Sequence, residues 1–433
     1  MATLNPGLPL LQQAEVKDKV VLLRVDHNVI KKGKIKDAFR IDSSLGTIVN
    51  ILARGGKPVL MTHVGRPYDK KSNTFTFDSN SDVTPLAAYL EQKLCCKVGL
   101  IEQPLPSPGQ GLTLDKKAAD AALDKLKSGR TQLLYLPNTR TLTGEESKGP
   151  ERQKLAQTLA GLADLYVNDA FGSWQPHAST YDVARYLPSY AGFLLQAELL
   201  GLTQALEPER PFLAVVAGSK YDTKIGPVTA LYEQADRLAL GGVVYNTYLC
   251  AKYGVKIEGV EENDIALARQ LVEMDRRQGK IVEFSHIVES DSLERKEGGC
   301  RVRAVADMKT GESLRLALDV AAQSFSHPEV KKVFREARTI FINAVMGLTP
   351  NFPEGSQALY EIAGQNKDAR KLYGGGDTLE QIKELNPAQY LRALDDAKSY
   401  FFTGGGSVLT ALEQRSAYGL EPVKALMGEI KPL

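Results

Sequence analysis

The chain has 433 residues, with 43% hydrophobic and 24% charged side chains, so it has enough apolar material for large cores and is not a disordered protein. Its formal net charge of +2 gives no general argument for binding nucleic acid or an anionic membrane surface, so any anion site must be a local cluster. At roughly 150 residues per domain, the length predicts two or three domains.

The first half of the chain alternates apolar runs with amphipathic stretches, which is typical of parallel βαβ units. We predict strands at 19–25, 57–62, 132–136 and 163–167, with helices at 41–54, 85–94 and 150–162. The polar segments 69–81 and 104–111 are expected to be solvated surface loops.

A helical pattern at 193–206 separates this half from a second one of the same style. Further strands are predicted at 211–217, 237–240, 280–284, 338–342, 370–373 and 400–403. The fold class is therefore α/β, with two doubly wound lobes of parallel sheet joined by a helical hinge. We expect lobes at 1–190 and 208–411, the hinge helix at 191–207 and a terminal segment, 412–433, returning to the first lobe.

Basic residues follow the predicted strands of the first lobe. Arginines 24, 40, 66 and 140 lie near four strand ends, together with His63 and His177. Arginine suits bidentate recognition of phosphate or carboxylate, and ligands of parallel sheets bind beyond the carboxyl ends of the strands. The alternative is a scatter of surface arginines, but the grouping favours a small-anion site.

Glycines follow the predicted strands of the second lobe. Gly374-Gly375-Gly376-Asp377 and Gly404-Gly405-Gly406 each precede a helix, and Gly218 begins a segment that contains Lys220 and Lys224. Such loops let backbone N–H groups approach a phosphate. One lobe for an anionic acceptor and one for a phosphate donor indicates phosphoryl transfer, with closure of the lobes to bring the substrates in line.

These residues resemble the phosphoglycerate kinase family over nearly the whole chain. The matching strings occur in the family's order: LLRVDHN, DAFRID, MTHVGRP, VNDAFGS, HAST, YLPSYAGFLLQAEL, AGSKYDTKIG, GGGDT and TGGGS. The resemblance implies reversible transfer of phosphate between 1,3-bisphosphoglycerate and ADP, with Mg²⁺ as cofactor and ATP/ADP as the nucleotide substrate. It also implies a monomeric cytoplasmic enzyme of glycolysis, without nucleic acid or membrane partners.

The resemblance also implies the site residues. The transferring phosphoryl group is expected to meet Arg40, Lys220, Gly376 and Gly405. The phosphoglycerate is expected to contact Arg24, Asp26, Asn28, His63, Arg66, Arg140 and His177. The nucleotide is expected to contact Gly218, Lys224, Gly242, Ala321, Asn343, Gly374, Gly375, Thr378, Gly404 and Gly406, and the metal Asp377.

Some positions depart from the family's usual strings. Trp174-Gln175-Pro176-His177 lacks an arginine of the basic patch, and Pro350 stands where a glutamate usually holds the nucleotide ribose. Val243 and Ala321 replace glycines near the expected base. Glu354 is a candidate to substitute for the lost glutamate. The departures leave two alternatives open: a divergent homologue that binds a phosphorylated metabolite or protein without transferring phosphate, and a kinase with another acceptor or nucleotide.

Overall fold

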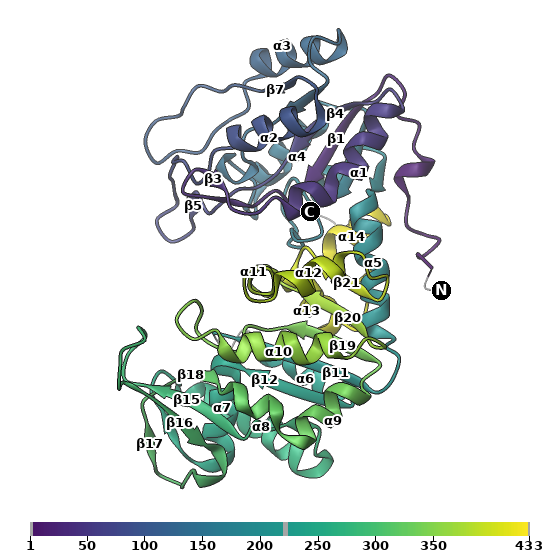
Figure 1. Cartoon of the computed structure of the whole chain (residues 1–433). Coiled ribbons are helices and arrows are strands. Elements are labelled where there is room, and N and C mark those ends of the chain that lie inside the picture. Colours follow the sequence, from purple (N-terminus) through teal and green to yellow (C-terminus); the bar gives the residue numbers. More distant parts are fainter. Residues whose placement is uncertain (1–2, 220–223, 432–433) are drawn as a thin grey trace. The chain divides into compact units, whose positions relative to one another are not determined.

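A computed structural model describes residues 3–219 and 224–431 of the chain, which divide into two compact units. Unit 1 runs to Leu200 and takes up the chain again from Tyr418, whereas unit 2 spans Gly201–Ala417. The change of unit falls within helix α5 (Phe193–Leu206), where the sequence predicts the hinge helix (Figure 1). The predicted lobe boundaries at 190, 208 and 411 stay predictions.

The sheet of unit 1 has six parallel strands, as predicted for a doubly wound lobe. Their spatial order is β10 (Ser189–Ala191), β9 (Leu165–Asp169), β1 (Val20–Val25), β4 (Lys57–Met61), β8 (Leu133–Tyr135) and β7 (Val98–Leu100). The helices of this unit are α1 (Phe39–Ala53), α2 (Thr84–Leu94), α3 (Lys116–Lys127), α4 (Pro150–Ala160) and α14 (Glu421–Leu426), with 3-10 turns at η1 (Leu11–Gln13), η2 (Thr139–Thr141) and η3 (Asp182–Arg185).

The unit 1 core explains how β1 presents a charged side chain. Val21, Leu23 and Val25 of β1 are fully or almost fully buried against Ile41 and Ile48 of α1 in one apolar cluster. Because successive strand residues point to opposite faces, Arg24 lies on the other side of the sheet. Its side chain is therefore enclosed near the carboxyl end of the strand, where the sequence predicts a ligand site.

Two short antiparallel hairpins complete unit 1. They are β2 (Ile30–Lys31) with β3 (Lys34–Ile35), and β5 (Tyr68–Asp69) with β6 (Thr74–Phe75). The expectation of an irregular loop at 69–81 is therefore wrong in part. The hairpin could not be recognised from the sequence, because its strands are only two residues long and lie among turn-forming residues.

Unit 2 has a second parallel sheet of six strands, in the order β14 (Ile281–Val282), β12 (Arg237–Gly241), β11 (Phe212–Gly218), β19 (Thr339–Asn343), β20 (Arg370–Gly374) and β21 (Ser399–Phe402). The order reverses between β11 and β19, which is the switch point where doubly wound sheets bind ligands. The helices are α6 (Ile225–Gln234), α7 (Gly242–Tyr253), α8 (Glu262–Gln278), α9 (Pro328–Glu336), α10 (Glu354–Gln365), α11 (Gly376–Leu385), α12 (Pro387–Leu394) and α13 (Gly405–Glu413).

Smaller sheets lie outside the unit 2 core sheet. The strands β16 (Cys300–Ala304), β15 (His286–Ser290) and β18 (Leu316–Val320) pair antiparallel, and β13 (Lys256–Ile257) pairs with β17 (Ser313–Leu314). Short 3-10 turns occur at η4 (Val305–Asp307) and η5 (Ala322–Ser326). Within the described part of the chain, no helix has the length and apolar character needed to cross a bilayer.

Candidate functional site

The charged residues of unit 1 gather at the carboxyl ends of β9, β1, β4 and β8, which are four neighbouring strands. Arg24 is the penultimate residue of β1, and Asp26 and Asn28 follow that strand; His63 and Arg66 follow β4. Arg140 lies in the turn after β8, and His177 lies in the segment after β9. Parallel pairing places these strand ends at one edge of the sheet, as the sequence predicts.

Arg24 is held by a buried hydrogen-bond chain. Only 1% of the residue is exposed, and its Nε donates to Ser179 Oγ at 2.9 Å. Ser179 in turn donates its backbone N–H to the buried carboxylate of Glu145 at 3.0 Å, and its hydroxyl to the same group. Burial lowers the pKa of Arg24, while Glu145 and Asp26 act to raise it. This series of hydrogen bonds fixes the orientation of the Arg24 guanidinium.

Burial lowers the pKa of both histidines of the cluster. Burial, followed by the charges of Arg140 and Arg24, holds the pKa of His63 well below its usual value. His63 Nδ1 lies 3.2 Å from Arg24 Nη2 and 3.2 Å from Ser173 Oγ. Burial also lowers the pKa of His177, against the raising effect of Glu145 and Glu146. The His63 ring therefore contributes hydrogen bonds, while the arginines supply the positive charge.

Arg40 and the polar pair after β1 lie together. Arg40 Nη1 is 3.4 Å from Oδ2 of the buried Asp26 carboxylate. Asn28 Oδ1 accepts a hydrogen bond from Gly65 N at 2.9 Å, and Arg140 Nη1 donates to Gly65 O at 2.9 Å. Gly65 thus joins the residues after β1, β4 and β8. Arg40 lies on the first turn of α1, which begins two residues before the predicted helix at 41–54.

A pocket of about 430 Å³ opens among these side chains. It is lined by Arg24, His63, Arg66, Tyr68, Lys70, Arg140, Glu146, Gly172, Ser173, Trp174, Gln175 and His177. Four arginine or lysine side chains face one glutamate in this lining, so the pocket can bind a small anion. Trp174 and Gln175, where the family's usual arginine is missing, form part of the wall.

The predicted nucleotide residues of unit 2 meet at the switch point of the sheet. Asn343 ends β19, and its Nδ2 donates to the carbonyl of Gly374, the last residue of β20, at 2.8 Å. Its Oδ1 accepts from Lys224 Nζ at 3.0 Å. Burial lowers the pKa of Lys224, and Asp377 acts to raise it. Lys224, the side-chain amide of Asn343 and the glycine loops after β20 and β21 therefore lie close together at the carboxyl end of the sheet.

The glycine loops approach one another too closely for side chains. A Cβ on Gly405 would lie 2.5 Å from Gly375 Cα, and a Cβ on Gly242 would lie 2.9 Å from Gly218 O. Gly242 also has φ +59°, which favours glycine. Gly376 opens α11, and Gly404 to Gly406 open α13. Both helix starts can offer N–H groups to a phosphate. Thr378 Oγ1 is used internally, accepting from Ala344 N at 3.1 Å.

Asp377 is an exposed carboxylate in the first turn of α11. The described residues contain no group of three or more His, Cys, Asp or Glu side chains arranged for a metal ion. One hard oxygen ligand fits Mg²⁺, which commonly takes its other ligands from phosphates and water. Asp377 therefore fits the predicted metal role. Lys220, predicted to meet the transferring phosphoryl group, lies outside the described residues.

The residues expected near the nucleoside differ in chemical character from the polar and glycine residues expected near the phosphates. Ala321 is buried with Val288 and Phe352 in a small apolar cluster, while Val243 is half-buried in α7 and Pro350 is exposed. The carboxylate of Glu354 forms an ion pair with Arg295, whose guanidinium lies 5.3 Å from the centre of the Phe352 ring. Glu354 is therefore already partnered in this structure.

Several supporting residues of the candidate site were not predicted from the sequence. Asn138 accepts from the backbone of Val64 and Arg140 and donates to two carbonyls, so it fixes the loop after β4. Glu145, Ser179 and Glu146 support the arginines. Ser179 lies in the matching string HAST, and Asn138 lies two residues before Arg140, but contacts between residues far apart in the sequence cannot be recognised from short strings. Lys70 also lines the pocket, on a segment expected to be a solvated loop.

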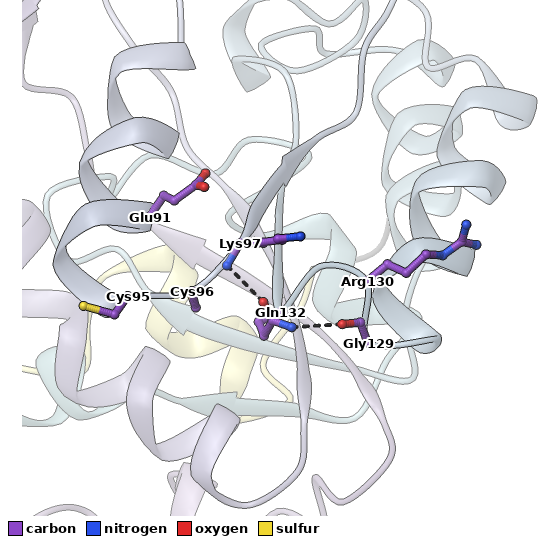
Figure 2. A pocket seen from close by; sticks show the side chains of 7 residues that line it. All are labelled: Glu91, Cys95, Cys96, Lys97, Gly129, Arg130 and Gln132. Carbon is purple, nitrogen blue, oxygen red and sulfur yellow. Dashed lines mark hydrogen bonds between the residues drawn. The ribbon is translucent and has the colours of Figure 1, made fainter.

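A second depression lies on unit 1, beside the starts of β7 and β8 (Figure 2). Glu91, Lys97 and Arg130 line it, with Cys95 and Cys96 at the end of α2. Gln132 also lines it, accepting from Lys97 N and donating to Gly129 O, both at 2.9 Å (Figure 2). None of the predicted site residues lines it. The four cysteines are unpaired thiols, and Cys95 is exposed.

The two parallel sheets, the basic pocket and the glycine-lined switch point together define the class of the protein: a two-unit α/β phosphotransferase. The family model for phosphoglycerate kinase matches residues 11–415. The chain belongs to the phosphoglycerate kinase family, whose members transfer phosphate to a carboxyl group. The family resemblance is thereby confirmed.

Curated relatives agree over almost their whole length. The chain is 34% identical to the phosphoglycerate kinase of Herpetosiphon aurantiacus over 93% of this chain and 95% of that protein. It is 32% identical to that of Dictyoglomus turgidum, over 95% and 96%. The structure of phosphoglycerate kinase from Coxiella burnetii matches with a TM-score of 0.72 and 28% identity, covering 98% of this chain and all of that one.

Proposed function

We propose that the chain catalyses reversible phosphoryl transfer between 1,3-bisphosphoglycerate and ADP, yielding 3-phosphoglycerate and ATP, in glycolysis and gluconeogenesis. The observation that carries the proposal is the basic pocket of unit 1, where Arg24, Arg66 and Arg140 meet from neighbouring strand ends. A phosphorylated carboxylic acid presents two anionic groups, and arginine recognises both.

The nucleotide is proposed to bind at the switch point of unit 2. The phosphates would meet the helix starts at Gly376 and Gly404 to Gly406, with Lys224 and Asn343 beside them. Asp377 would hold Mg²⁺, which supplies charge neutralisation to the nucleotide phosphates when bound. The residues Gly218, Gly242, Gly374, Gly375, Thr378 and Ala321 would form the remaining walls.

The proposed mechanism is electrostatic. The attacking carboxylate of 3-phosphoglycerate is already ionised at neutral pH, so no general base is required. The guanidinium of Arg40, which lies beside Asp26, would stabilise the charge of the transferring phosphoryl group. Lys220 would accompany that phosphoryl group during the transfer. Closure of the two units about α5 would bring the substrates in line and exclude water. We further propose a monomer acting in the cytoplasm, without nucleic acid or membrane partners.

A second candidate is a kinase with a different nucleotide preference. It is favoured by the exposed Pro350 and by the Glu354–Arg295 ion pair, because neither leaves an unpartnered carboxylate for the ribose. We expect ATP and GTP to be used with similar kcat/KM. A preference for ATP above about a hundredfold would contradict this expectation and show that other residues read the base.

The test is a coupled assay with 3-phosphoglycerate, Mg²⁺ and ATP, repeated with GTP. Turnover that disappears in Arg40→Ala supports the proposed function. If the folded chain shows no turnover with either nucleotide, the proposal fails. Binding of 3-phosphoglycerate without turnover would then indicate a non-catalytic homologue, whereas absent binding would indicate another acceptor.

A further inference from the structure

Lys70 lines the basic pocket from a hairpin that the sequence presents as a solvated loop. Strand β5 pairs Tyr68 with Phe75 of β6, and their rings stack with centroids 4.7 Å apart. The turn is closed by Asp69, which accepts from Lys71 N at 2.8 Å and from Ser72 Oγ at 2.9 Å. Lys70 is the first residue of this turn and therefore has a defined position.

The hairpin is also attached to its surroundings by backbone hydrogen bonds. Phe75 N donates to Gly109 O at 3.0 Å, and Thr76 N donates to Pro67 O at 2.7 Å. These bonds hold the hairpin without any contribution from the Lys70 side chain. The ammonium group is therefore available for a role other than fixing the hairpin.

Lys70 shares the carboxylate of Glu146 with Arg140. Its Nζ lies 2.8 Å from Glu146 Oε2, and Arg140 Nε lies 2.8 Å from Glu146 Oε1. Burial alone would raise the pKa of Glu146, but the hydrogen bond from Lys70 and the charge of Arg140 hold it below its usual value. Glu146 is thus an ionised counter-ion to both cations at neutral pH.

The side chains of this shared contact differ in their exposure to solvent. The Lys70 side chain is 66% exposed, whereas Glu146 is 11% exposed and Arg140 is 22% exposed. A surface ion pair contributes little energy, so Lys70 can leave Glu146 for a stronger anion while Arg140 keeps the carboxylate in place. A dianionic phosphate in the pocket is such an anion.

We propose that Lys70 binds the phosphate group of the acceptor. The inference rests on the proposed function. Arg40, which is proposed to stabilise the transferring group, is not among the residues that line the pocket, so the pocket receives the non-reacting end of the molecule. Trp174 and Gln175 provide no cation to the lining of the pocket, and Lys70 supplies one from the β5–β6 hairpin.

The test measures binding of 3-phosphoglycerate to the full chain by titration calorimetry without nucleotide. We expect Lys70→Met to weaken binding roughly tenfold, Lys70→Arg to restore most of it, and the affinity of Lys70→Met to fall less steeply with added NaCl. Lys71→Met is the matched control, because Lys71 is exposed on the same turn and does not line the pocket. In the coupled assay, Lys70→Met should raise KM for 3-phosphoglycerate and leave kcat within about twofold.

Two results would overturn the inference in distinguishable ways. Equal binding by Lys70→Met and the unchanged chain, or an equal loss in Lys71→Met, would remove Lys70 from the site and leave the proposed function standing. No binding by the unchanged chain would overturn the proposed function itself and, with it, the role of Lys70. Circular dichroism on each variant separates lost binding from lost folding, and Lys70→Arg retains the charge if Lys70→Met unfolds.

Discussion

The side-chain amide of Asn343 donates to the backbone carbonyl of Gly374 at 2.8 Å and so joins the ends of two neighbouring strands. Its oxygen accepts from Lys224 Nζ at 3.0 Å, which connects the segment after a third strand, β11. One buried amide thus fixes the relative positions of a glycine loop and a lysine, both predicted to meet nucleotide phosphates.

Removal of this amide should weaken nucleotide binding and stability together. In Asn343→Ala, the Gly374 carbonyl loses its donor and Lys224 loses its acceptor, so we expect KM for the nucleotide to rise roughly tenfold and the free energy of unfolding to fall by about 1–2 kcal/mol. Steady-state kinetics and urea unfolding measure the two effects. Asn263→Ala, at an exposed position of α8, is the control. Unchanged KM in Asn343→Ala would remove Asn343 from the nucleotide site.

A methyl group should disrupt the contact between the two glycine loops. In Gly405→Ala the new Cβ would lie 2.5 Å from Gly375 Cα and 3.0 Å from Asn343 Nδ2, so one loop must move. We expect the displacement to raise KM for the nucleotide at least tenfold, since phosphate binding by N–H groups requires close approach. Gly299→Ala is the control, because its Cβ meets atoms no closer than 3.5 Å. Equal kinetics in the two variants would contradict the close-approach argument.

The two sheets could be predicted because their central strands are apolar runs bounded by polar turns. The predicted strands at 19–25 and 57–62, for example, correspond to β1 and β4 within about one residue. The carboxyl ends of parallel strands lie at the same edge of the sheet, so the grouping of Arg24, His63 and Arg140 could also be predicted from the sequence. The short edge strands β7 and β10 were missed, because neither is a continuous run of buried apolar residues, whereas the equally short β8 is fully buried.

The supporting contacts could not be predicted. Ser179 meets Arg24 across 155 positions of sequence, and Glu145 meets Ser179 across 34, so no local spacing reveals either contact. Lys70 likewise enters the pocket only because a two-residue strand pairing turns the chain back. The local sequence shows which charged and polar residues follow a strand. The tertiary structure determines which other side chains hold those residues in position.

Loss of the Arg40 guanidinium should affect turnover more than binding. Arg40 lies on the first turn of α1, with Nη1 at 3.4 Å from Asp26, and is proposed to stabilise charge that develops on the transferring group. We expect Arg40→Ala to lower kcat by roughly 10³-fold, with a small change in KM for 3-phosphoglycerate. Arg130→Ala, an exposed arginine in the depression of Figure 2, should retain full activity. Retention of most turnover by Arg40→Ala would exclude the proposed role.

A buried carboxyl at the end of β9 should give the stability of the chain a distinctive pH dependence. Asp169 is fully buried; its Oδ1 accepts from Leu195 N at 3.0 Å, and its Oδ2 has no hydrogen-bond partner. Burial raises the pKa of Asp169 from 3.8 to about 7, although hydrogen bonds from Leu195 N, the Thr47 side chain and Leu194 N act to lower it. The folded chain therefore holds a proton that the unfolded chain has lost between these pH values.

The contribution of Asp169 to the free energy of unfolding should fall by about 1.4 kcal/mol per pH unit as the pH rises from about 4 to 7. Asp169→Asn cannot titrate and resembles the protonated carboxyl in shape, so its advantage over the unchanged chain should grow through this window and then level off. Buried His27, whose pKa burial lowers to about 3, has the opposite effect, but it is common to both proteins and cancels in the difference. Urea unfolding at pH 5, 6, 7 and 8 measures that difference. Asp120→Asn, at an exposed surface ion pair, should give a difference that is nearly independent of pH. A flat difference for Asp169→Asn as well would mean that Asp169 is ionised throughout in the folded chain.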